Sequence, residues 1–143
     1  MKPKILVILA STRQNRAGEG IAKWVMSELV KRSDADYELV DLRDFKLPYF
    51  DYATPASMLT EYSTEIETQW AEKVDEADGY IVVTAEYNHS MPAVLKSALD
   101  LPYKQWNNKP IAYVSYGSAA GGSRAVEQLR LIAIEQQMAP IRS

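Results

Sequence analysis

The chain has 143 residues, of which 47% are hydrophobic and 24% charged, values that are typical of an ordinary globular protein. The formal net charge of -3 gives no electrostatic reason to expect nucleic acid or an anionic membrane as a partner. The chain contains no cysteine, which excludes disulfides, thiolate chemistry and cysteine-based metal or iron–sulfur sites. We therefore expect one domain over residues 1–143, large enough for a single core.

The N-terminal residues lead at once into a short apolar run. This run is too short for the apolar part of a signal peptide and far too short to span a membrane. We expect a cytoplasmic protein without a membrane segment, and the absence of cysteine is compatible with that reducing compartment.

Four segments have the pattern of β-strands. Residues 5–10, 80–84 and 111–115 are continuous apolar runs, as in strands that are buried on both faces of a sheet. Residues 37–42 alternate between apolar and polar side chains, as in an outer strand with one partly exposed face. Apolar residues recur at helical spacing in the segments 21–29, 64–77, 91–99 and 122–137.

The alternation of strands and helices predicts an α/β fold, a doubly wound parallel sheet with right-handed crossovers and helices on both faces. Residues 137–143 have the pattern of the start of a fifth strand, after which such a domain would normally continue with a further helix. We therefore expect a short last strand and a missing final helix. On this interpretation the chain is truncated, or a partner covers the face that would be left exposed.

The loop 11–16 follows the first predicted strand and precedes a helix. It contains two hydroxyl side chains, Ser11 and Thr12, and two arginines, Arg13 and Arg16. Hydroxyls, backbone N–H groups and a helix N-terminus at one point are suited to binding a phosphate. The glycine patterns of the Walker P-loop and of the dinucleotide-binding fingerprint are absent. The alternative is a polar turn with solvated arginines.

Two further loops follow predicted strands, and ligands of such sheets bind at the carboxyl ends of the strands. Glu86, Tyr87 and Asn88 could border a planar heterocycle, or they could form a plain loop before Pro92 opens the next helix. His89 is the only histidine; we expect a surface residue, with a role as proton donor or gate as the alternative. The loop 116–122 is glycine-rich and could approach a flat ligand closely, or it could simply be the entry to a helix.

The tryptophans have different sequence contexts. Trp24 and Trp70 occupy apolar positions of predicted helices and are expected in the core. Trp106 lies in a polar loop and is expected to be exposed or at an interface.

Taken together, three motifs resemble the NAD(P)H-dependent FMN reductase family, which includes quinone, azo-dye and chromate reductases. The similarity covers nearly the whole chain up to Ile141, and a departure is Ala85, where many relatives have proline. The motifs are Ser11-Thr12-Arg13-x-x-Arg16-x-Gly18, Glu86-Tyr87-Asn88-x-Ser90-x-Pro92-x-x-Leu95-Lys96-x-Ala98-Leu99-Asp100 and Tyr116-Gly117-x-x-x-Gly121-Gly122.

The resemblance implies a flavodoxin-like sheet of strand order 2-1-3-4-5 with FMN at the switch point. It implies that the FMN phosphate is held by Ser11, Thr12, Arg13 and Arg16. It also implies that Glu86, Tyr87 and Asn88 border the isoalloxazine, and that its pyrimidine side is covered by Ser115, Tyr116, Gly117, Gly121 and Gly122. No catalytic side chain and no metal are expected, because the flavin carries the chemistry.

The implied activity is the passage of two electrons from NADPH or NADH through FMN to a small-molecule acceptor: a quinone, an azo compound or a metal oxyanion. The helix 91–100 is implied to form the interface of a homodimer or homotetramer. The alternatives are a flavodoxin-type electron carrier and a cofactor-free interaction module. A phosphoacceptor receiver domain is excluded, because Thr84-Ala85 and Ala10-Ser11 stand where it needs acidic residues.

Overall fold

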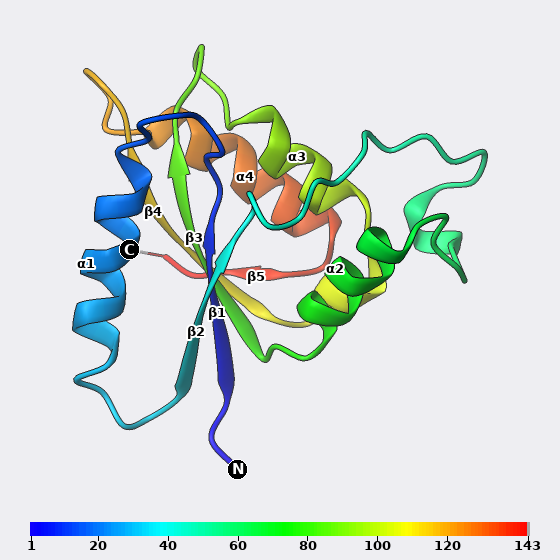
Figure 1. Ribbon diagram of the computed structural model, residues 1–143, viewed down its shortest axis with the longest axis horizontal. Helices are drawn as coiled ribbons and strands as arrows, with labels where there is room; N and C mark the ends of the chain where they lie inside the picture. Colours follow the sequence, from blue (N-terminus) through cyan, green and yellow to red (C-terminus); the bar gives the residue numbers. More distant parts are fainter. Residues whose placement is uncertain (143) are drawn as a thin grey trace.

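The computed structural model describes residues 1–142, which form a parallel sheet flanked by helices (Figure 1). The order of the strands in the sheet is β2-β1-β3-β4-β5. This order and the α/β class confirm the predicted fold. The strands are β1 (Lys4–Leu9), β2 (Asp36–Asp41), β3 (Gly79–Ala85), β4 (Pro110–Tyr116) and β5 (Ala139–Pro140).

Helices cover the two faces of the sheet unequally (Figure 1). α1 packs on one face against β1 and β3, whereas α2, α3 and α4 pack on the other. Within the described residues, α1 is the only helix on its face, and Ala112 and Val114 of β4 remain partly exposed there. The helices are α1 (Gly18–Leu29), α2 (Glu65–Asp75), α3 (Ala93–Asp100) and α4 (Ser123–Glu135), with short 3-10 turns at Ala56–Met58 and Lys104–Trp106.

The larger core lies under α2, α3 and α4 and is centred on aromatic rings. Tyr80 and Trp70 both contact Trp106 edge to face, with ring centroids 4.7 and 6.2 Å away. The indole N–H of Trp70 donates to the carbonyl of Ala98 at 2.7 Å. Such aromatic pairs contribute about 0.5–1.5 kcal/mol each beyond the area that they bury.

Two of the three tryptophan predictions are wrong. Trp106 is fully buried, because the turn Lys104–Trp106 folds its ring inward onto Tyr80. Trp24 is 60% exposed, because the buried face of α1 is formed by Gly18, Ala22 and Val25. Trp24 lies two residues from Ala22, about 200° around the helix, and so points away from the sheet. The prediction for Trp70 is confirmed.

The fifth strand is real but short. It consists of Ala139–Pro140, which pair in parallel with Pro110 and Ile111 at the end of the sheet. Ser143, the last residue of the predicted strand 137–143, lies outside the described residues. Among residues 1–142, no helix has the length and apolar character that crossing a membrane requires.

Candidate functional site

The structure brings the three predicted loops together at the carboxyl edge of the sheet. β1, β3 and β4 are neighbours, so the loops that follow them begin side by side. The Glu86 N–H donates to the carbonyl of Tyr116 at 3.0 Å, which joins the second loop to the third. The hydroxyls of Ser11 and Tyr87 lie 2.7 Å apart and join the first loop to the second. The residues expected to form one site therefore do lie together.

Two arginines hold the carbonyl groups of the first loop. The guanidinium of Arg16, whose side chain is only 4% exposed, donates to the Ser11 carbonyl at 2.6 Å. Arg43, two residues beyond the end of β2, donates to the carbonyls of Thr12 at 3.3 Å and of Arg13. Three consecutive carbonyls are thus bound on the side of the loop that faces these guanidiniums.

This arrangement leaves the opposite side of the loop rich in free donors. The chain has no cis peptide bond among its described residues, and in a trans peptide the C=O and the following N–H point in opposite directions. The N–H groups of Thr12, Arg13 and Gln14 therefore point away from the arginines, and they donate to no acceptor within residues 1–142. The first residues of α1 also lack a side-chain cap. Free N–H groups beside an uncapped helix N-terminus fit an anion.

Arg16 itself makes a bidentate ion pair with Asp41, the last residue of β2. Its Nη1 donates to Asp41 Oδ1 at 2.7 Å, and Nη2 donates to Oδ2; only Nε has no partner among the described residues. Burial opposes the ionisation of Asp41, but the hydrogen bonds from Arg16 and from the Arg43 N–H outweigh it, so the pKa of this carboxyl is lowered. The hydrogen bond to Asp41 raises the pKa of Arg16 in turn. Arg16 thus holds the first loop in place. Asp41 and Arg43, which take part in this arrangement, were not among the residues predicted from the sequence.

The second loop is a tight turn between Tyr87 and Ser90, whose backbones exchange two hydrogen bonds of 2.8 and 2.9 Å. Its central residues have positive φ angles, 51° at Asn88 and 67° at His89, as in a type I′ turn. Asparagine and histidine are among the residues that tolerate this region best after glycine. Asn88 is therefore exposed at the apex of the turn.

Glu86 turns toward α4 and not toward the open side of the loop. Its side chain is 6% exposed, and it accepts from the backbone N–H of Arg124 at 3.2 Å and from Arg124 Nε at 2.5 Å. The hydrogen bond from Arg124 lowers the pKa of this carboxyl. The carboxylate also supplies the start of α4 with an acceptor that the N-cap residue Gly122 cannot provide. A contact from Glu86 to a ligand would therefore use its backbone.

The third loop depends on the absence of side chains at two glycines. A Cβ at Gly122, where φ is +90°, would lie 2.7 Å from Ser115 Cβ and 2.8 Å from the Tyr116 nitrogen. A Cβ at Gly18 would lie 2.4 Å from the Tyr116 hydroxyl, which packs on the start of α1. Such contacts are too short to be tolerated without a shift of the neighbouring atoms. This hydroxyl is buried and has no hydrogen-bond partner within residues 1–142.

The motifs and their geometry agree with a comparison against known families. The model of the family described as NADPH-dependent FMN reductase matches residues 3–143. The chain belongs to this family. The prediction of an FMN reductase of the flavodoxin-like class is thereby confirmed at the level of the family.

Relatives and solved structures agree with this assignment. The chain is 41% identical over 141 residues to an NAD(P)H-dependent FMN reductase of Schizosaccharomyces pombe, an alignment that covers 96% of this chain and 70% of the relative. It is 32% identical over 136 residues to a 2-hydroxy-1,4-benzoquinone reductase of a Burkholderia species, covering 92% and 69%. The structure of FerB, a flavoenzyme NAD(P)H:(acceptor) oxidoreductase from Paracoccus denitrificans, superposes with a TM-score of 0.78 at 20% identity, covering 98% and 75%. This last likeness shows the shared fold.

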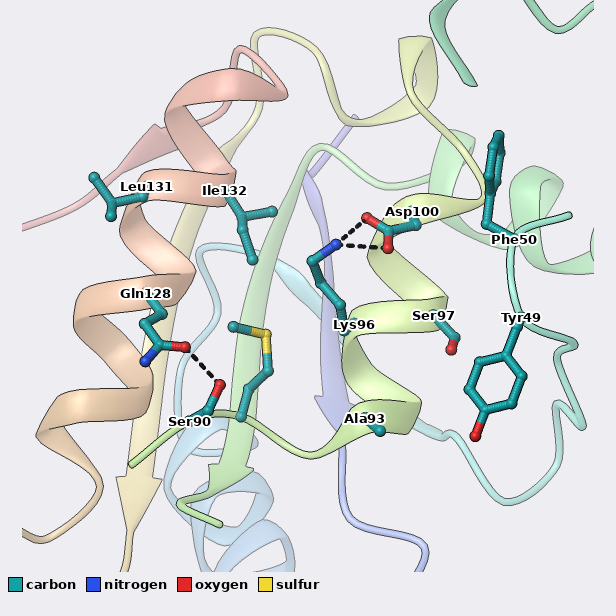
Figure 2. A pocket seen from close by; sticks show the side chains of 11 residues that line it. Tyr49, Phe50, Ser90, Ala93, Lys96, Ser97, Asp100, Gln128, Leu131 and Ile132 are labelled. Carbon is teal, nitrogen blue, oxygen red and sulfur yellow. Dashed lines mark hydrogen bonds and ion pairs between the residues drawn. The ribbon is translucent and has the colours of Figure 1, made fainter. Parts of the chain in front are cut away.

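In this member of the FMN reductase family, a large cavity lies beside the loops and not between them. Its volume is about 720 Å³, and it separates α3 from α4 (Figure 2). Lys96 and Asp100 of α3 form an ion pair of 2.6 Å at its wall, and Tyr49 and Phe50 lie beyond α3. Only Ser90 belongs to both this cavity and the second loop.

The close approach at Gly18 makes a testable difference between two glycines of α1. Gly18→Ala should lower the free energy of unfolding by about 1–3 kcal/mol through overpacking. Gly20→Ala, where no atom beyond the neighbouring helix backbone lies within 4 Å of the added Cβ, should raise it by about 0.5–1 kcal/mol. Urea unfolding measures both. Tyr116→Phe should restore part of the loss in the Gly18→Ala background, and equal effects at the two glycines would contradict the packing described.

The ion pair between Arg16 and Asp41 should make stability depend on pH. A lowered carboxyl pKa contributes stability that is present above the unfolded value of about 3.9 and is lost as pH falls through the folded value. Asp41→Asn should therefore lower the free energy of unfolding by about 2–4 kcal/mol at pH 7, and this gap from the wild type should narrow below about pH 4. Asp44→Asn, at an exposed neighbour without an ion pair in the described structure, is the control. If the difference in unfolding free energy between Asp41→Asn and the wild type stays constant with pH, the ion pair does not contribute to stability as described.

Proposed function

We propose that this chain is an NAD(P)H-dependent quinone reductase that holds FMN at the carboxyl edge of its sheet. The proposal rests on the first loop, because Arg16 and Arg43 bind its carbonyl groups by hydrogen bonds while its N–H groups remain without an acceptor in the described structure. A phosphate monoester is an anion with several acceptor oxygens, so it matches these donors.

The residues present fit the phosphate of FMN. The N–H groups of Thr12, Arg13 and Gln14 would bind it together with the Thr12 hydroxyl and the exposed guanidinium of Arg13. Ser11 is fully buried with its hydroxyl on that of Tyr87, so it would act by holding the loop. Arg16 would act mainly by holding the loop, because its Nη groups are engaged by Asp41 and Ser11. Its unpaired Nε is the group that remains for a ligand.

The ring of FMN would be bordered by the second and third loops. At one edge of the ring, hydrogen-bond donors and acceptors would come from the backbone of Glu86, Tyr87 and Asn88. The exposed side-chain amide of Asn88 offers both as well. The pyrimidine side would face the third loop, where the close packing of glycines allows the backbone to approach a flat ligand. The residues proposed to cover the pyrimidine side are Ser115, Tyr116, Gly117, Gly121 and Gly122.

Bound FMN supplies the chemistry, since it accepts two electrons as hydride from a nicotinamide and passes two electrons on. The chain supplies binding, orientation and fixed charge. Among the described residues, the three loops contain no cysteine or serine–histidine pair arranged as a nucleophile, and the reaction proposed needs none. Backbone N–H groups of the third loop, beside the pyrimidine side of the ring, would also favour the negative charge that a reduced flavin carries.

Quinones are the acceptors that we favour, because a relative at 32% identity is named a 2-hydroxy-1,4-benzoquinone reductase. Azo compounds and metal oxyanions are tested as alternative acceptors in the same assay, which measures the oxidation of NADPH or NADH with each acceptor in turn. A flavodoxin-type carrier would bind FMN but would not oxidise the nicotinamide. We extend the proposal to a cytoplasmic setting, where these reductants are available.

The decisive measurement is the loading of the protein with FMN followed by addition of NADPH without oxygen. We expect a yellow protein whose flavin absorbance is bleached and then restored by a benzoquinone. Arg13→Ala should weaken FMN binding by about 1.5–3 kcal/mol, a loss of about 10- to 150-fold. Arg32→Ala removes an equal charge at the far end of α1 and should leave FMN affinity unchanged. Protein that binds no FMN in calorimetry would refute the proposal.

We further propose that the chain forms a homodimer or homotetramer through the face that contains α3. The cavity between α3 and α4 is open and largely apolar, and Leu131 of α4 at its rim is 69% exposed (Figure 2). A second copy packed there would remove this apolar surface from water.

Leu131→Glu should shift the mass measured by sedimentation toward the monomer, because it places a charge in the proposed interface. Val30→Glu, on the opposite side of the sheet and 71% exposed, is the matched control and should leave the mass unchanged. A wild-type monomer at high protein concentration would refute this assembly.

A further inference from the structure

The second loop is fastened to α4 by side chains that no part of the proposed function uses. Arg124 Nη1 lies 2.7 Å from Nε2 of His89 while its other nitrogens bind Glu86. One turn further along α4, Gln128 donates to the His89 carbonyl at 2.9 Å and accepts from the Ser90 hydroxyl at 2.5 Å. His89 is thus held at both its ring and its backbone, at a position where φ is positive.

The chemistry of Arg124 decides the state of the imidazole. A guanidinium has only donors and does not lose its proton in proteins, so Nε2 of His89 has to be the acceptor. A neutral imidazole with its proton on Nδ1 satisfies this requirement. A protonated imidazole has no acceptor, and it would bring a second positive charge to within 2.7 Å of the guanidinium.

The surroundings couple this contact to the rest of the site. The charged groups that the structure places against His89 are Arg124, from α4, and Glu86, from its own loop; Gln128 and Ser90 are neutral. Arg124 is shared between Glu86 and His89, so displacing the guanidinium from the imidazole also disturbs the pair at the start of α4. No other hydrogen bond within residues 1–142 involves the ring of His89.

We propose that Arg124 and His89 are positioning residues whose contact helps to fix the left-handed turn of the second loop on α4 while the imidazole of His89 is neutral. Protonation would release the ring from α4 and loosen the turn whose backbone is proposed to border the flavin. The dependence of FMN affinity on this contact rests on the proposed function, whereas the contact itself does not.

NMR of the ligand-free protein tests the contact directly, because His89 is the only histidine and its ring signals need no assignment against others. At neutral pH the ring nitrogens should show the tautomer protonated at Nδ1. Arg124→Met, which keeps an unbranched chain without donors, should abolish this preference. A wild-type ring protonated at Nε2 would overturn the proposal, and that spectrum decides the matter even if the variant does not fold.

The consequence for binding is measured with FMN between about pH 5 and 8, the range in which histidine changes charge. His89→Gln is the matched variant, since its amide oxygen can accept from Arg124 and cannot be protonated. The wild type should lose affinity on acidification about 2- to 10-fold more than His89→Gln, as for the loss of one hydrogen bond. Ionisation of the FMN phosphate affects both proteins and cancels in the ratio.

Parallel affinity curves for the wild type and His89→Gln would refute the pH-dependent positioning. Failure of both proteins to bind FMN at any pH would instead refute the proposed function. In that case the same pair is compared by hydrogen exchange of the amides of residues 86–90, which should speed up on acidification in the wild type alone.

Discussion

The buried guanidinium of Arg16 is the constraint on which the candidate site depends. A charge that is almost completely removed from water has to be paired, and Asp41 at the end of β2 provides the carboxylate. The planar fork of the guanidinium then has one direction left for Nη1, toward the Ser11 carbonyl. Lysine could not do both, because its ammonium group lacks the fixed bidentate geometry. The ion pair therefore determines which way the peptide groups of the first loop face, and so where its free N–H groups point.

The order of the strands explains why this brace is possible. β2 lies next to β1, so its last residue, Asp41, and Arg43 two residues later come to the carboxyl end of β1, where the first loop begins. The second loop follows β3 and touches the ends of both neighbouring strands, but the side chains that hold its turn come from α4, through Arg124 and Gln128. The two loops are thus fixed from opposite sides by separate parts of the scaffold. A ligand that lies across both is held by a site formed before it binds, which lowers the entropic cost of binding.

Most of the fold could be predicted from the sequence, because apolar runs and helical spacing report directly on burial. The three central strands and all four helices lie within a few residues of the predicted segments. Trp24 could not be placed, since an apolar side chain in a sequence window does not say which side of a helix meets the sheet. Trp106 could not be placed either, because its polar neighbours in the sequence do not report the turn Lys104–Trp106 that buries its ring.

The site was predictable as a set of loops but not as a set of contacts. The residues that carry the motifs do converge, because parallel strands end at one edge. The roles of Arg16 and Glu86 depend on Asp41 and Arg124, which are 25 and 38 residues away in the chain. No local pattern reports such pairings. The order 2-1-3-4-5 would have suggested Asp41, because it brings the ends of β1 and β2 together, but it gives no comparable signal for Arg124.

The two partly buried ion pairs have opposite polarity, and this difference sets the electrostatic character of the site. In the first loop the cation belongs to the loop and the carboxylate to the scaffold; in the second, Glu86 belongs to the loop and Arg124 to the scaffold. Each pair cancels its own charge. Glu19 in the first turn of α1 pairs with Lys23, so the charges that remain at the first loop are Arg13, Arg43 and the uncapped start of α1, all positive. The second loop is left with neutral groups when His89 is neutral. A molecule with an anionic end and a flat, uncharged heterocycle is complementary to this distribution. The reverse orientation would place its charge at a loop whose cation in the described structure, Arg124, is already paired with Glu86.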